Sequence, residues 1–134
     1  MKFFRLLSAG LGLGLLSQMA VAHHSTNGIY DETTEIELTG TVKDWRFINP
    51  HPSMMLQVTG PDGKIQEWDI SYGGSAVTHL MRRGFTAETF KDGDVLVFKG
   101  NPAKIEGAYG LLVRGNPKRP DGTSVPAATP PPAP

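Results

Sequence analysis

The chain has 134 residues, with 13 basic and 13 acidic side chains, so its formal net charge is zero. It contains no cysteine, which excludes disulfide bonds and lipid attachment through a cysteine thiol. The balanced charge disfavours nucleic-acid binding, because contacts with phosphates require clustered positive charge. A chain of this length supports one hydrophobic core, so we expect a single small folded domain.

Residues 1–22 have the pattern of a signal peptide. Lys2 and Arg5 precede a short, largely apolar run, and the Ala-Val-Ala sequence that ends at Ala22 is a typical signal-peptidase site. The apolar run is too short for a membrane-spanning helix, which needs about 20 residues. We therefore expect cleavage after Ala22 and a periplasmic or secreted protein with no membrane anchor. Because the leader carries two basic residues and no acidic one, the mature chain would have a net charge of −2.

The rest of the chain divides into three parts by composition. Residues 23–34 are a polar lead-in, whose large apolar residues Ile29 and Tyr30 are expected to hold it against the domain. Residues 35–115 carry regular hydrophobic patterns and are expected to form the domain. Residues 116–134 contain seven prolines and almost no large apolar side chains, which predicts an extended, disordered tail.

The first predicted strand covers residues 35–47 and is long. Apolar residues alternate with polar ones from Ile36 to Val42, the pattern of a half-buried strand. The phase then shifts by one residue, so that Trp45 and Phe47 return to the core face. A shift of this kind predicts a β-bulge, which bends a strand and suits a sheet that closes on itself.

Four shorter strands are predicted after the first. A proline-rich turn at residues 49–52 leads into a strand over residues 53–59, and a Gly-Pro-Asp-Gly turn joins this strand to a third over residues 64–72. The fourth and fifth strands are expected over residues 95–99 and 109–114.

One short helix is predicted between the third and fourth strands. Ser75 is a candidate N-cap and Gly84 a candidate terminator. The apolar residues at helical spacing between them are Ala76, Val77, Leu80 and Met81. Three strands, a helix and two strands is the order of a Greek-key barrel of the OB type. We therefore predict a mainly β, five-stranded OB-like barrel, with an open α+β meander as the competing architecture.

Three local motifs together resemble a known family. They are Ala22-His23-His24-Ser25 at the expected cleavage site, Asn49-Pro50-His51 after the first strand, and Arg83-Gly84-Phe85 followed by Gly93-Asp94. Their order and spacing resemble a family of small exported bacterial domains of unknown function, over most of residues 22–114. The resemblance implies a periplasmic or secreted β-rich domain with recurring histidines at His23/His24 and His51, and it supplies no known activity. The proline-rich end departs from the family pattern.

Three of the four histidines are the candidate metal ligands: His23, His24 and His51. After cleavage at Ala22, the free α-amino group of His23 could chelate a metal together with its imidazole. An amine with two or three imidazoles is a donor set that favours Cu(II). We therefore predict that these residues bind copper or another divalent metal, with His51 held on a rigid turn between two prolines. A solvated terminus, with His51 bonded to its own turn, is the alternative.

No group of residues in the sequence indicates catalysis. His79 lies on the polar face of the predicted helix, which favours a solvated side chain. Glu67 and Asp69 share a strand face that we expect to be exposed, and no nucleophile motif such as G-x-S-x-G is present. We therefore predict a non-catalytic, exported binding or accessory module. The alternative to metal binding is a metal-free domain that recognises an envelope protein, a saccharide or another small ligand through the barrel face.

Overall fold

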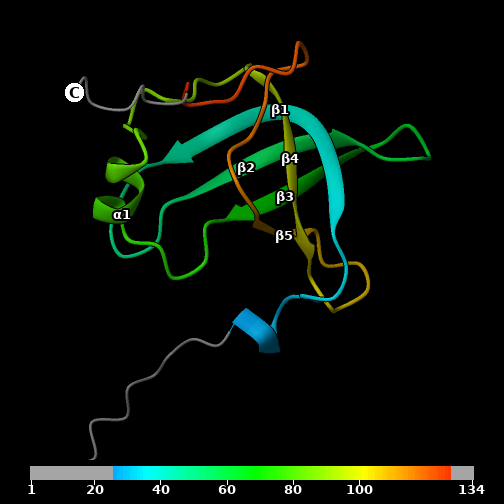
Figure 1. Ribbon diagram of the computed structural model, residues 1–134. Helices are drawn as coiled ribbons and strands as arrows, with labels where there is room; N and C mark the ends of the chain where they lie inside the picture. The colour runs from blue at the N-terminus through cyan, green and yellow to red at the C-terminus, as the bar shows by residue number, and fades with distance from the viewer. Residues whose placement is uncertain (1–25, 128–134) are drawn as a thin grey trace, which may run out of the picture.

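A computed structural model describes residues 26–127 of the chain. Five strands close into one barrel in the order β1-β2-β3-β5-β4 (Figure 1). The elements along the chain are η1 (Thr26–Gly28), β1 (Ile36–Arg46), β2 (Ser53–Thr59), β3 (Ile65–Ser71), α1 (Val77–Arg82), β4 (Val95–Pro102) and β5 (Gly110–Val113). The predicted five-stranded barrel with one short helix between the third and fourth strands is confirmed. The predicted signal peptide, His23 and His24 lie outside the described residues.

The long strand β1 closes the barrel because its two halves pair with different partners. Its first half, from Ile36 to Thr41, pairs with β4, and its second half pairs with β2. The register with β2 shifts between Lys43 and Arg46, where the bulge was predicted. Within this interval Asp44 has a φ of 50°, in the left-handed region that non-glycine residues seldom adopt. The bend that results is visible as the curved course of β1 in Figure 1.

The helix closes one end of the barrel, but its start differs from the prediction. Ala76 is the N-cap, and Ser75 makes no capping bond. The Val77 N–H instead donates to Asn49 Oδ1 at 3.3 Å, so the turn after β1 supplies the bond that Ser75 was expected to make. Leu80 is buried as predicted, whereas Met81 is 58% exposed and does not belong to the apolar stripe. Within residues 26–127, no helix is long and apolar enough to cross a membrane.

The core fills the barrel with the inward-facing residues of all five strands. In β2 these residues are Met54, Leu56 and Val58, as the alternation predicted. Aromatic residues after α1 cover the end of the core, where Phe90 contacts the Trp45 ring edge-on at 5.0 Å between centroids. The indole N–H of Trp45 donates to the Thr86 carbonyl at 3.1 Å, which ties the bulged end of β1 to this cover.

The predicted disordered tail is wrong for residues 116–127, which pack on the barrel. Pro117 is fully buried, and Val125 is buried within the core cluster. Lys118 pairs with Val97 of β4 through two backbone hydrogen bonds of 2.8 and 2.9 Å. Proline content indicated a lack of regular structure, but the buried Pro117 and Val125 and the backbone bridge to Val97 together anchor this irregular segment. Residues 128–134 lie outside the described part of the chain.

The buried hydroxyl of Tyr72 leads to a stability prediction. It has no hydrogen-bond partner within residues 26–127, and burial raises the pKa of Tyr72 above its ordinary value. A buried polar group without a partner costs free energy of folding. We expect Tyr72→Phe to raise the free energy of unfolding by about 1 kcal/mol in urea denaturation.

Tyr109→Phe is the matched control for this substitution, because Tyr109 is 42% exposed. Its stability should change by less than about 0.5 kcal/mol. A loss of stability in Tyr72→Phe would contradict the prediction and show that the hydroxyl makes a favourable contact.

Candidate functional site

A pocket of about 420 Å³ lies between the lead-in and the outer face of β2 and β3. Ser53 in β2 and Asp69 and Ser71 in β3 alternate with inward-facing residues, so their side chains point away from the core. Thr26, Ile29 and Tyr30 of the lead-in complete the wall, together with His51, Pro52, Gly73 and Gly74. The pocket therefore brings together residues from three separate parts of the sequence.

The lead-in is held against β4 and the loop that follows it. The Asp31 N–H donates to the Pro102 carbonyl, and the Lys104 N–H donates to the Ile29 carbonyl, both at 2.9 Å. Tyr30 is 9% exposed and pairs with Ala103, so the prediction that it anchors the lead-in is confirmed. Ile29 is 56% exposed, and its side chain does not share this role.

Thr26 has a defined position at the pocket because η1 and its own side chain hold it. Its carbonyl accepts hydrogen bonds from the Ile29 and Tyr30 N–H groups at 3.0 and 2.9 Å. Its hydroxyl donates to Glu32 Oε1 at 2.9 Å. His23 precedes Thr26 by three residues, and three extended residues span at most about 11 Å. His23 and His24 themselves lie outside the described residues.

His51 and Asp69 are the two residues of the pocket wall that can bind a cation through a side chain of metal-ligating type. His51 is exposed and precedes the fully buried Pro52, which fixes its backbone at the entry to β2. Partial burial raises the pKa of the Asp69 carboxyl above its ordinary value, and the positive charge of Arg46 opposes this shift. A carboxylate that has lost part of its hydration gains more from a bound cation than a fully solvated one does.

Sequence reasoning missed Asp69 as a site residue. It placed Glu67 and Asp69 together on an exposed strand face, which is confirmed, but of the two only Asp69 lines the pocket. Asp69 pairs with Met55 across β2 and β3, close to the start of β2 that follows His51. Asp69 could have been found only from the register between β2 and β3. The alternation of residues within a single strand does not reveal this register.

The described residues alone do not form a complete metal site. Within residues 26–127, no group of three or more His, Cys, Asp or Glu side chains lies close enough to hold a metal ion. His79 is on the exposed side of α1 and does not line the pocket. His51 and Asp69 offer one nitrogen and one carboxylate donor, which is an incomplete donor set for a metal ion.

The comparisons with known proteins identify a family and no activity. The model described as "Family of unknown function (DUF6152)" matches residues 12–112. This range includes His51 and Asp69, and it ends before the segment over residues 116–127. No curated protein matches the chain.

Proposed function

The chain belongs to this family of unknown function, and we propose that it is an exported, non-catalytic module that binds copper or another divalent metal. The proposed ligands are the mature amino terminus, His23, His24 and His51, with Asp69 as an additional carboxylate donor. The observation that supports the proposal is that Thr26 and His51 line the same pocket.

The chemistry of these donors suits copper. An α-amine and imidazoles are nitrogen donors, and Cu(II) has the highest affinity of the first-row divalent ions for such sites. Asp69 would add a negative charge that offsets part of the metal's charge in a partly desolvated pocket. His51 and Asp69 are held by the barrel, so this part of the donor set is positioned before a metal binds. A preorganised half-site lowers the entropic cost of binding.

A copper titration of the mature chain with a verified His23 terminus tests the proposal. We expect stoichiometric Cu(II) binding that His51→Ala and Asp69→Asn each weaken by about tenfold or more. One extra residue before His23 should weaken it as well, because it displaces the α-amine. Calorimetry with a competing chelator measures the affinities, and the visible absorption band of Cu(II) reports the change in nitrogen ligands.

Two substitutions serve as matched controls for the titration. Glu67→Gln removes a carboxylate two residues from Asp69 on the same strand face, and His79→Ala removes an imidazole outside the pocket. Both should bind copper as the unaltered chain does. Binding no tighter than that of the peptide HHSTNG would contradict the proposal. Binding lost only with the extra residue would contradict a site shared with the barrel.

A partly exposed aromatic pair supports a second candidate, a metal-free domain that recognises an envelope protein or saccharide. The rings of Trp68 and Tyr109 lie 5.4 Å apart between centroids, and Tyr109 is 42% exposed. Aromatic faces of this kind bind the apolar faces of sugars and peptide side chains. Ligand binding of this kind should be lost in Tyr109→Ala and unchanged by an extra residue before His23.

A further inference from the structure

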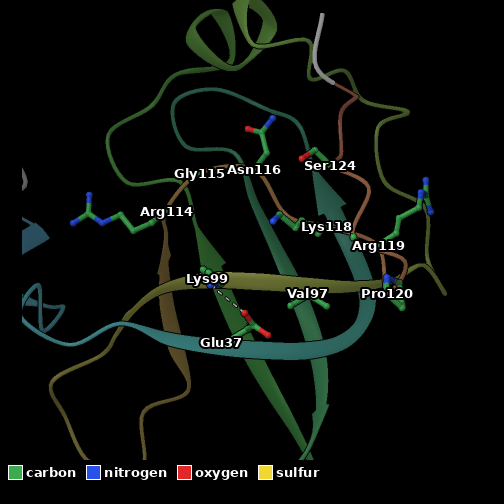
Figure 2. A pocket seen from close by; sticks show the side chains of 11 residues that line it. Glu37, Val97, Lys99, Arg114, Gly115, Asn116, Lys118, Arg119, Pro120 and Ser124 are labelled. Atoms are coloured by element: carbon green, nitrogen blue, oxygen red, sulfur yellow. Dashed lines mark ion pairs between the residues drawn. The ribbon is translucent and has the colours of Figure 1, made fainter.

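A second pocket, of about 520 Å³, lies on the outer face of β1 and β4. It shares no lining residue with the pocket at His51. Figure 2 shows Glu37, Val97 and Lys99 on the strands, Asn116, Lys118 and Ser124 on the segment that faces them, and Arg114 and Arg119 at the two sides. The segment over residues 116–127, which the sequence predicted to be disordered, therefore forms one wall of this pocket. We call the pocket the basic groove, because most of its charged lining residues are Lys or Arg.

The strand register places the charged side chains of the floor on one face. Val97 and Lys99 alternate with buried Leu96 and Phe98, so both point outward. Glu37 of β1 is the direct cross-strand neighbour of Lys99. Because Lys118 pairs with Val97 as a further strand residue would, its side chain extends over the same outer face.

The wall of the basic groove is held in place by its own backbone. The Val125 N–H donates to the Pro117 carbonyl at 2.8 Å, which closes the segment into a loop. Within this loop the Arg119 N–H donates to the Thr123 carbonyl at 2.8 Å. The Arg83 guanidinium donates to Asn116 Oδ1 at 2.5 Å, which leaves the amide N–H groups of Asn116 available as donors. The backbone of Lys118 and Arg119 is thus positioned before any ligand binds.

The charge of the basic groove is unbalanced although the whole chain is neutral. Four cationic side chains and one acidic side chain line it: Lys99, Arg114, Lys118, Arg119 and Glu37. Lys99 is paired with Glu37 at 3.4 Å, and Arg114 with Glu32 at 3.7 Å. Among the described residues, the side chains of Lys118 and Arg119 have no hydrogen bond or salt bridge.

The acidic residue nearest in sequence to these two cations, Asp121, forms no salt bridge with either of them among the described residues. Asp121 accepts hydrogen bonds from the backbone N–H and the hydroxyl of Thr123 at 2.9 and 2.7 Å. These bonds are the main cause of its lowered pKa, and Arg119 contributes only a smaller effect. Lys118 and Arg119 therefore line the groove without a salt-bridge partner among the described residues, with Arg119 at its side (Figure 2).

We propose that the basic groove binds a small oxyanion with two or more negative charges, of the di- or tricarboxylate or diphosphate type. The volume lies within the range of small-molecule sites, about 300–1,000 Å³. Lys118 and Arg119 supply charge-assisted hydrogen bonds, and Asn116 and Ser124 supply neutral donors beside them. Lys118 and Arg119 lie beyond the residues that the family model matches, so this site belongs to the C-terminal segment of this chain.

Titration of the full chain with citrate and with pyrophosphate tests the proposal. We expect saturable binding of at least one probe at about 50 mM salt, seen as NMR shift changes at residues of the groove, and weaker binding as salt increases. The double variant Lys118→Gln/Arg119→Gln should bind about tenfold more weakly or worse. Glu37→Gln should bind several-fold more tightly, since it removes the one acid of the lining and releases Lys99.

The control variant Lys64→Gln/Lys91→Gln removes two exposed positive charges that line neither pocket. Its affinity should stay within about twofold of the unaltered chain, since distant exposed charges are screened. Binding of citrate alone would show that the ligand is a carboxylate, and binding of pyrophosphate alone would show that it is a phosphate. Equal weakening in both double variants, or no saturable binding of either probe, would overturn the proposal.

Discussion

The variant Gly100→Ala is expected to lose about 3 kcal/mol or more of the free energy of unfolding. A Cβ at Gly100 would lie 2.2 Å from the carbonyl oxygen of Leu112 and 2.9 Å from its carbonyl carbon. Both are backbone atoms of β5, so no side-chain rotation can relieve the contact. The two strands would have to separate where Gly100 pairs with Val113. Because β5 joins β3 to β4, this separation opens the barrel.

Chemical denaturation followed by tryptophan fluorescence measures this effect, with Gly28→Ala as the control. A Cβ at Gly28 would meet nothing within 4 Å, so its free energy of unfolding should change by less than about 1 kcal/mol. Gly100 does not have a left-handed φ, and the expected loss comes from the contact alone. Similar stabilities for the two variants would show that β4 and β5 can move apart at low cost.

Ending the chain after Gly115 should destabilise the domain by about 4 kcal/mol, the other of the two largest effects that we expect. The truncation exposes the core surface that Val125 and Pro117 cover, and burial of one such aliphatic side chain contributes about 1.5–3 kcal/mol. It also removes both backbone hydrogen bonds from Val97, each with a net value of about 1 kcal/mol.

A second truncation, after Ala127, is the matched control, because it retains every contact described for residues 116–127. Its urea midpoint should equal that of the full chain, and Val125→Ala should fall between the two truncations. The shorter truncation should also abolish citrate and pyrophosphate binding, whereas the longer one should preserve it. Equal midpoints for both truncations would mean that the packed segment contributes nothing to stability.

The barrel itself could be predicted because its signals are local. Alternation in residues 53–59 identified the inward face of β2, and the phase shift before Trp45 identified the bulge. Both patterns follow from the two-residue period of a strand, which any short stretch of sequence displays. The helix position was also correct, although the hydrogen bond to its first N–H group came from Asn49, 28 residues before Val77 in the sequence.

The end of the domain could not be predicted from composition. A proline-rich segment with one valine lacks the hydrophobic period that identifies a strand or helix. Its order depends on a bridge to Val97 and on a gap in the core that Val125 fills, and both belong to the assembled barrel. The basic groove has the same origin, since Lys118 faces Lys99 only after this bridge has formed.

The candidate metal site was also partly predictable from the sequence and partly not. Residue type and chain position alone indicated His23, His24 and His51 as ligands, and their convergence stays a prediction. The tertiary structure added Asp69 and showed that Thr26 lines the same pocket as His51.

The sequence by itself determined the family, the strand faces, the bulge and the donor types. Each of them follows from residue types in short stretches of sequence. Only the tertiary structure decided which distant residues come together: Asp69 and His51 line one pocket, Val97 pairs with Lys118, and the segment over residues 116–127 packs on the core. These meetings depend on strand register and barrel closure, which join residues far apart in the chain. Local periodicity defines the face of a strand, and closure of the barrel defines its neighbours.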